Sequence, residues 1–369
     1  KASIGRGIEL KDIMAHDNPA FVNGCNGSLQ AEFLRTIKRL KALNVDYVAV
    51  PQWHQLEIKA DGIWRILETA ENPFTLQDED LAFFVKAAHD SGLKVMMGNM
   101  IQGLAGGEGD PLNLPQPTAE NIDKWLAAYS VFMKSKAAYF SAIGLDYWAL
   151  DCNGCLFYDG NTLSEELQFK FVEGYTKLLA DLKRQYVGRI YLHWPAWGTL
   201  PSAAKLLSSI DAIRTAPYHG EWTVEEERAL TVDSYRERLR AHENSSLYAI
   251  AEQLGKTVIF TAGIQSRGNA LSKPGYVEET VCTDEYFVMN PPIDKCIQLK
   301  TPADFSLQAI VYEATLEYIN SLQLRAGAIV VPADYWENDL MIPANVFPNT
   351  GATIRNKPAE GILKAWYAR

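Results

Sequence analysis

Lys256–Arg267 has the sequence KTVIFTAGIQSR, and this stretch decides the fold. Its apolar run, Val258–Phe260, is rich in the β-branched and aromatic residues typical of a strand buried on both faces of a parallel sheet. Polar residues follow within a few positions, among them Gln265 and Arg267. This order predicts a buried strand whose carboxyl end presents polar side chains at the mouth of a barrel.

Seven more runs of this kind recur along the chain, with helical patterns between them. Leu29–Leu43, Asp78–Gly92 and Ser306–Leu322, for example, repeat apolar residues at three- and four-residue spacing. The eight strand-like runs lie at or start near Ile8, Val45, Leu93, Leu145, Arg189, Ile210, Lys256 and Gly327. Strands that alternate with helices indicate the α/β class, and eight of them predict a (β/α)8 TIM barrel, as a single domain over residues 1–369.

Composition narrows the function. Of the 369 residues 47% are hydrophobic, which is typical of a globular protein with a large core. The formal net charge of −10 argues against nucleic-acid binding, because that depends on clustered Lys and Arg. No run reaches the roughly 18 to 20 apolar residues of a membrane span. The opening residues lack the apolar core of a signal peptide, and a signal removed before Lys1 is compatible with the secreted or periplasmic location that we expect.

Several motifs, in the same order, resemble the family 113 β-mannanases and their relatives. Val45–Gln55 (VDYVAVPQWHQ), Thr75–Gln102, Asp304–Ile319 and Asn356–Tyr367 are similar to that family's second strand, third-strand region, last long helix and ending. The opening stretch is similar to its seventh strand, GKPVIFTEIGYRS. The resemblance implies a (β/α)8 glycoside hydrolase that acts on a carbohydrate.

The resemblance also implies where two catalytic carboxylates are missing. The family's nucleophile is the Glu after Phe-Thr, and this chain has Ala262 there. The family's acid/base Glu after the fourth strand aligns with Asn153. Natural divergence is the preferred interpretation, because two engineered changes are required otherwise. An engineered nucleophile-to-Ala variant of a retaining glycosidase and a non-catalytic carbohydrate-binding barrel stay open as alternatives.

Glycosidic hydrolysis needs a proton donor and a second carboxylate, so other acidic residues at strand ends are candidates. Asp151 lies in LDYWALDCNGC, which resembles the fourth strand of the α-galactosidase barrels, where the second Asp is the nucleophile; Ala149 stands where that motif has Lys. Glu221 is the nearest carboxylate after the sixth strand. We expect Asp151 as nucleophile or base and Glu221 as acid, with Asp334 and Glu337 after the eighth strand in reserve.

Polar and aromatic residues at other strand ends suit a sugar, because aromatic rings stack on its C–H faces while amides and imidazoles bind its hydroxyls. The expected substrate-binding residues are Gln52, Trp53, His54, Asn99, Gln102, Asn153, His193, Trp194, Tyr218, His219, Trp222, Gln265, Arg267, Tyr335 and Trp336. Cys152 and Cys155 have C-x-x-C spacing, but no second pair completes a zinc site. We therefore expect no metal and no cofactor, and the sequence leaves the oligomeric state open.

Overall fold

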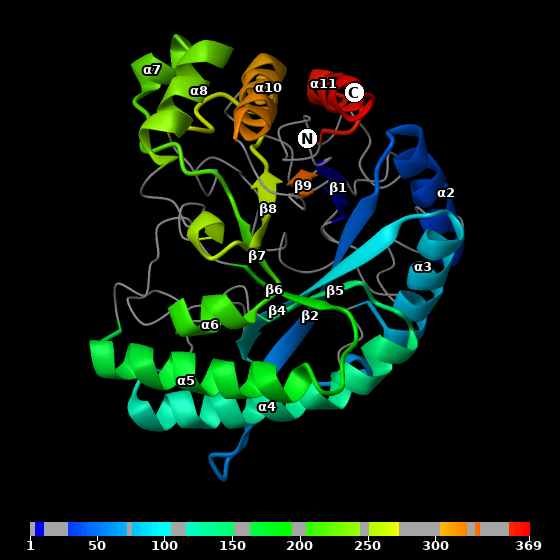
Figure 1. Cartoon of the computed structure of the whole chain (residues 1–369), viewed down its shortest axis with the longest axis vertical. Coiled ribbons are helices and arrows are strands. Elements are labelled where there is room, and N and C mark those ends of the chain that lie inside the picture. The colour runs from blue at the N-terminus through cyan, green and yellow to red at the C-terminus, as the bar shows by residue number, and fades with distance from the viewer. Residues whose placement is uncertain are drawn as a thin grey trace, which may run out of the picture.

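The computed structural model describes ten segments of the chain (Figure 1). They are residues 4–10, 29–71, 76–104, 116–150, 163–193, 204–243, 251–272, 303–322, 329–332 and 354–369. The strands within them are β1 (Gly5–Glu9), β2 (Tyr47–Ile58), β3 (Trp64–Ile66), β4 (Lys94–Leu104), β5 (Tyr147–Ala149), β6 (Arg189–His193), β7 (Ala212–Thr215), β8 (Thr257–Ala262) and β9 (Ile329–Pro332). Each of the eight strand-like runs in the sequence therefore contains a strand.

Eight of these strands form a closed parallel ring. Neighbours pair in the order β1, β2, β4, β5, β6, β7, β8 and β9, and β9 pairs with β1 again. The two pairings of β1 close the ring: Gly7 pairs with Tyr47 of β2, and Gly5 pairs with Ile329 of β9. The predicted (β/α)8 barrel is confirmed.

The ninth strand, β3, forms a hairpin that the sequence did not predict. It pairs antiparallel with the far end of β2, Ile58 opposite Trp64. Gly62 has a φ of 80° in the connecting turn, a conformation that glycine adopts without a Cβ clash. Asp61 Oδ1 accepts a hydrogen bond from the Ile63 amide at 3.1 Å. The hairpin extends the sheet beyond the barrel wall.

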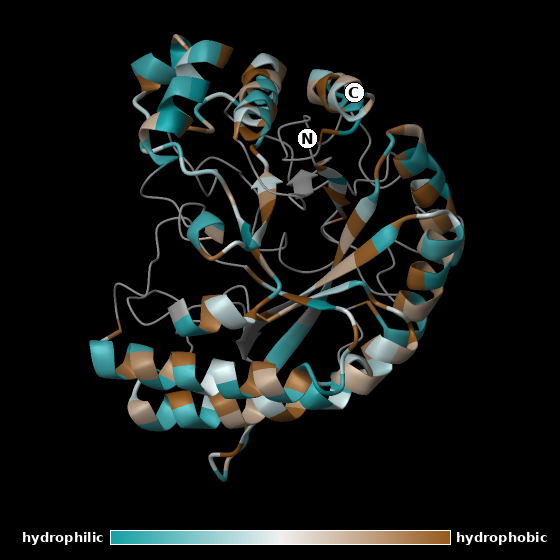
Figure 2. Ribbon diagram, viewed as in Figure 1, coloured by the Kyte–Doolittle hydropathy of each residue, from teal (hydrophilic) through white to brown (hydrophobic). Residues whose placement is uncertain are grey.

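Helices cover the outside of the barrel (Figure 1). They are α2 (Leu29–Ala42), α3 (Asp78–Asp90), α4 (Ala119–Ala142), α5 (Glu165–Leu182), α6 (Ala204–Ser209), α7 (Val224–Arg228), α8 (Val232–Ala241), α10 (Phe305–Ser321) and α11 (Pro358–Tyr367), with a short 3-10 helix, η1 (Thr69–Glu71). The long helices are banded brown and teal in Figure 2, the pattern of one apolar and one polar face. Among the described residues, no helix is both long and apolar enough to cross a membrane.

The two faces of each strand have different neighbours. One set of strand residues fills the inside of the barrel: Ala49, Met96, Tyr147, Ala149, Tyr191, Ala212 and Ile259. The alternate residues, such as Val48, Val258 and Phe260, join the large core shared with the helices. The inside is thus a packed core and not a pore, which leaves chemistry to the loops at the carboxyl ends of the strands.

Candidate functional site

The structure describes eight of the predicted site residues with their side chains: Gln52, His54, Tyr218, His219, Glu221, Trp222, Gln265 and Arg267. It places four more by their backbone only: Trp53 on β2, Asn99 and Gln102 on β4, and His193 at the end of β6. Asp151, Asn153, Trp194, Asp334, Tyr335, Trp336 and Glu337 lie outside the described residues. The described part therefore shows one sector of the barrel mouth.

Gln52 is held by the helical layer and not by the mouth. Its side chain is 0% exposed and shares the helix-facing side of β2 with Val48 and Val50. Its amide nitrogen donates to the Leu76 carbonyl at 2.9 Å and to Asp78 Oδ1 at 3.3 Å. Gln52 thus ties β2 to the start of α3.

His54 lies on the same side of β2 and is also 0% exposed. Its Nδ1 is 3.2 Å from the Leu67 carbonyl. Its ring packs edge-on against the Phe132 ring, with the two ring centroids 4.5 Å apart. Burial lowers the pKa of His54 to about 4, so the ring is neutral at pH 7. These contacts join β2, the chain after β3 and α4, which is a structural arrangement.

Lys136 of α4 completes this buried polar cluster. It is 5% exposed, and its Nζ lies 2.7 Å from Asp78 Oδ2 and 2.6 Å from Glu68 Oε2. Burial alone favours the neutral amine, but hydrogen bonds to Asp78 and Glu68 outweigh it and raise the pKa of Lys136. We call Gln52, His54, Asp78 and Lys136 the β2 cluster.

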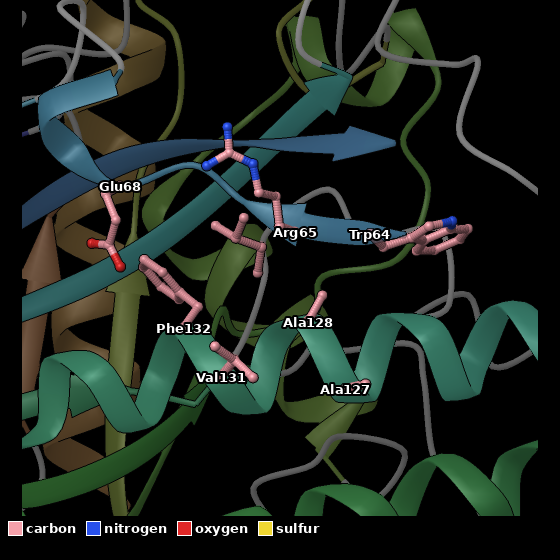
Figure 3. A pocket seen from close by; sticks show the side chains of 8 residues that line it. Trp64, Arg65, Glu68, Ala127, Ala128, Val131 and Phe132 are labelled. Atoms are coloured by element: carbon pink, nitrogen blue, oxygen red, sulfur yellow. The ribbon is translucent and has the colours of Figure 1, made fainter. Parts of the chain in front are cut away.

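A shallow cavity of about 200 Å³ lies beside this cluster, between β3 and α4 (Figure 3). Its lining residues are Trp64, Arg65, Ile66, Glu68, Ala127, Ala128, Val131 and Phe132. Arg65 extends from β3 and pairs with Glu57 and Glu71, while Glu68 pairs with Lys136. The cavity contains none of the predicted site residues.

The predicted residues that follow β7 form an aromatic group. Trp222 stacks on Tyr235 of α8 with ring centroids 5.7 Å apart, and the Arg238 guanidinium lies 4.5 Å from the Trp222 ring centroid. Tyr218 stacks on His219 at 6.4 Å. The rings hold the β7–α7 loop against α8.

His219 has one ring nitrogen in use. Its Nδ1 lies 2.8 Å from the Gly220 carbonyl and 3.1 Å from the indole nitrogen of Trp222. A single nitrogen either donates to the first or accepts from the second, so these contacts are alternatives. Both contacts use Nδ1, so the other ring nitrogen, Nε2, has no hydrogen-bond partner among the described residues in either tautomer. Burial lowers the pKa of His219, which favours the neutral ring.

Glu221 is exposed, and it lies in the β7–α7 loop three residues before α7 begins. Its backbone carbonyl accepts from Arg238 at 3.0 Å. Its carboxylate forms no hydrogen bond or ion pair with any other residue in the described part of the chain. The side chain is therefore accessible to a ligand from solvent.

Gln265 and Arg267 lie just beyond β8. Arg267 is 3% exposed, and its Nε donates to Gln265 Oε1 at 2.6 Å. Arg267 also forms an antiparallel bridge with Ala303, and the Asp304 amide donates to the Ser266 carbonyl at 2.9 Å. Both ends of the connection over residues 268–302 are thereby fixed at one place. Gln265 Nε2 has no partner among the described residues.

His219 and Gln265 meet at a cavity of about 250 Å³ between the ends of β7 and β8 and helices α8 and α10. The lining residues are Ala216, Pro217, His219, Tyr235, Thr261, Ala262, Gly263, Ile264, Gln265, Ala270, Leu271, Val311 and Thr315. None of these has an ionised side chain at neutral pH. We call this space the β7–β8 cavity.

Ala262 belongs to this cavity and to the outer core. It is 5% exposed and lies in the same apolar cluster as Val258 and Phe260. The position where the resemblance implies a nucleophile thus faces α10, whose Tyr312 hydroxyl donates to the Ala262 carbonyl at 3.3 Å. The described residues place no carboxylate in the lining of this cavity.

Arg214 is a polar group inside the barrel that the sequence pattern did not lead us to predict. Arg214 is 6% exposed and lies on β7 two residues after Ala212 of the interior set; its Nε donates to Thr261 Oγ1 at 2.8 Å. The signal was a charged residue directly after the apolar pair Ala212 and Ile213, within a run expected to be a strand. Among the described residues, no three His, Cys, Asp or Glu side chains are grouped so that they could hold a metal ion.

Comparison with known proteins gives structures but no sequence relatives. No family model matches the sequence, and no curated protein matches it. The solved structure of a GH113 beta-1,4-mannanase superimposes with a TM-score of 0.64 and 16% identity, covering 100% of this chain and 99% of that one. The two chains share the (β/α)8 fold.

Two further glycoside hydrolase structures extend the likeness. The GH113 beta-mannanase of Alicyclobacillus acidocaldarius in complex with ManMIm has a TM-score of 0.62 at 15% identity, with 99% of this chain and 97% of that chain covered. A GH5_18 variant from Streptomyces cattleya, in complex with Manb1-4GlcNAc, has a TM-score of 0.60 at 13% identity, with 100% and 81% covered. At these identities the likeness is one of fold, and it confirms the expected architecture.

Proposed function

We propose that this protein is a glycoside hydrolase that cleaves a glycosidic bond at the carboxyl face of its barrel. The observation that supports this most is the likeness in fold, over the whole chain, to enzymes that act on β-linked sugars. Active sites of (β/α)8 enzymes lie at that face. A secreted or periplasmic location remains a prediction.

Asp151 is our candidate for nucleophile or base. It follows β5 by two residues, and Tyr147 and Ala149 of that strand both belong to the interior set. Asp151 itself lies outside the described residues, and it is a candidate because catalytic residues of (β/α)8 enzymes come from the carboxyl ends of the strands. Glu221 is the candidate acid because its carboxylate is exposed and unpaired among the described residues. Asp334 and Glu337 stay in reserve.

The test is hydrolysis of β-1,4-mannan, β-1,4-galactan and a wider panel of glycans by Asp151→Asn and Glu221→Gln. We expect the first change to reduce the rate by about a thousandfold, since it removes the nucleophile or base, and the second by about a hundredfold, since it removes the proton donor. Glu225→Gln is the matched control, because Glu225 is an exposed carboxylate four residues from Glu221. Near-normal hydrolysis by Asp151→Asn removes Asp151 from the mechanism.

One observation favours a second candidate, a non-catalytic carbohydrate-binding barrel: the β7–β8 cavity is lined by uncharged groups alone. That candidate predicts glycan binding by the wild-type protein without product release over long incubation. Ala262→Glu distinguishes it from an inactivated enzyme, since only the latter should gain hydrolysis from the restored carboxylate.

A further inference from the structure

We propose that the amino face of the barrel, opposite the candidate catalytic face, binds a small doubly charged oxyanion such as phosphate or sulfate. The first residues of four neighbouring strands form the site: Tyr47 of β2, Lys94 of β4, Tyr147 of β5 and Arg189 of β6. We call them the amino-face cluster. Active sites of (β/α)8 enzymes lie at the other face, so binding here does not depend on the proposed hydrolysis.

The strand registers place all four side chains on the inner side of the barrel wall. Tyr147 belongs to the interior set, and Tyr47 packs against that set. Lys94 is in register with Tyr47, and Arg189 is in register with Tyr147. Residues in register on adjacent parallel strands lie on the same side of a sheet, so each cation shares the side of its ring. The amino opening of the barrel therefore carries two positive charges.

The four side chains contact one another across the strands. Lys94 Nζ lies 5.6 Å from the Tyr47 ring centroid, and the guanidinium carbon of Arg189 lies 5.7 Å from that of Tyr147. The two rings meet edge-on, with their centroids 5.8 Å apart. Both cations are exposed, and neither pairs with a carboxylate in the part of the chain that the structure describes. An anion can therefore reach them from solvent.

The hydrogen bonds of the two phenols leave donors unused. Arg189 Nη1 donates to the Tyr147 hydroxyl oxygen at 3.1 Å, and Tyr147 shares a second side-chain hydrogen bond with Tyr47. Burial raises the pKa of both phenols, so each keeps its proton at neutral pH. Tyr147 is 4% exposed and gives its proton to Tyr47, the acceptor that the described residues provide. The Tyr47 proton and the Lys94 ammonium then have no acceptor among those residues.

The carboxylates of the same face point the other way. Three aspartates each directly precede a residue on the inner side of its strand and therefore face the helical layer: Asp46, Asp146 and Asp211. Their partners, at 2.7 to 2.9 Å, are Arg6, His89 and Lys183 in that order. Each aspartate also accepts a hydrogen bond from a backbone amide. These negative charges are thus engaged outside the ring of strands.

The cations dominate the field inside the opening. Burial is the main cause of the raised pKa of Tyr47, and among the charges Arg189, which lowers that pKa, outweighs either Asp46 or Asp146. Arg189 and Lys94 both act to lower the pKa of Tyr147, against the effect of its burial. The amino-face cluster is therefore a positive region, although the chain as a whole has a formal net charge of −10.

This set of groups selects a dianion. Lys94, Arg189 and the Tyr47 hydroxyl all offer hydrogen donors, and charged oxygens are the acceptors that bind such donors most strongly. A singly charged ligand leaves one of the two cations without a counterion, whereas sulfate or phosphate neutralises both. The negative charge of the whole chain repels anions in general, so binding has to come from this cluster.

The test is a titration of the full-length protein with sodium sulfate and sodium phosphate at neutral pH and constant ionic strength. Calorimetry and NMR of ¹³C-labelled tyrosines follow the binding, and Tyr47→Phe identifies the Tyr47 resonance. We expect a saturable shift of that resonance, with half-saturation near about 1 mM because the cations are exposed and screened. Acetate, with one charge, should bind about tenfold more weakly. Equal binding of acetate overturns the assignment to a dianion.

Lys94→Met and Arg189→Met each remove one positive charge and keep an unbranched apolar side chain. Each should weaken sulfate binding by about tenfold, and Tyr47→Phe, which removes one donor, by about threefold. Arg184→Met is the matched control, because Arg184 is an exposed cation five residues before Arg189 that pairs with Asp181. It should bind sulfate as the wild-type protein does.

The inference is overturned if neither sulfate nor phosphate gives a saturable shift of the Tyr47 resonance. It is also overturned if Lys94→Met and Arg189→Met, shown by thermal unfolding to be folded, bind sulfate as tightly as Arg184→Met does.

Discussion

Gln52 and Gln265 have the same side chain near the carboxyl ends of two barrel strands, but their surroundings differ. The amide nitrogen of Gln52 donates to Leu76 and Asp78 within the β2 cluster. That of Gln265 has no partner among the described residues and lines a cavity. The β2 cluster also holds unpaired polar atoms, since Gln52 Oε1 and His54 Nε2 are buried with no hydrogen-bond partner among the described residues. The difference between the two glutamines is access, because Gln52 is enclosed under the helices and Gln265 lines a cavity.

Lys136→Met should have the largest effect on stability of the changes considered, because it acts on the β2 cluster. It leaves the carboxylates of Asp78 and Glu68 without their shared cation, and we expect a loss of about 3 kcal/mol in the free energy of unfolding, measured by urea denaturation. Lys134→Met is the control on the same helix, because its more exposed pair with Asp181 should contribute less than about 1 kcal/mol. Equal losses contradict the structural role of the β2 cluster.

Acid should weaken the β2 cluster through His54. Burial lowers its pKa to about 4 from an ordinary value of 6.5, so the unfolded chain takes up the proton first. The stabilisation is complete above pH 6.5 and is lost as the pH falls toward 4, by about 2 to 3 kcal/mol. Unfolding measured from pH 7 to pH 4 should show this loss, and His54→Phe should remove its share of the pH dependence. An unchanged profile in that variant contradicts the assignment.

Changes at the two glutamines should differ in their cost. Gln52→Leu removes the donor for Leu76 and Asp78 and should cost about 1 to 2 kcal/mol of stability. Gln265→Glu keeps the acceptor for the buried Arg267 and should destabilise the protein less than Gln52→Leu does. Thermal unfolding of both variants provides the comparison. The distinction between the regions fails if Gln265→Glu is the more destabilised variant.

The sequence predicted the eight barrel strands because β-branched runs persist where both faces of a strand are buried. Because both faces are apolar, the sequence does not show which side chains of a strand point toward the helices. Val48 and Val50 share a side with Gln52 and His54, but the alternate residues of β2 are buried too, so the apolar pattern does not show which side meets the helices. The β3 hairpin was missed because three residues are too few to produce a pattern.

The candidate site was predictable in part. His219 and Gln265 were selected by their residue type and their place after strands, and the structure brings them to one cavity. Tyr235 and Thr315, which complete its walls, come from helices distant in the sequence, and no local pattern links them to β8. Asp151, Asp334 and Glu337 remain predictions from sequence.

The bridge between Arg267 and Ala303 has a consequence for how this barrel can change. Residues 268–302 leave and rejoin the fold at the same place, since Asp304 and Ser266 are hydrogen-bonded beside the bridge. The entropy of closing such a loop grows only slowly with its length, so lengthening, shortening or exchanging the part beyond Ser272 imposes little strain on β8 or α10 and leaves the buried Ala270 and Leu271 in place. The bridge is a natural graft point, where new recognition segments can be spliced onto an unchanged barrel.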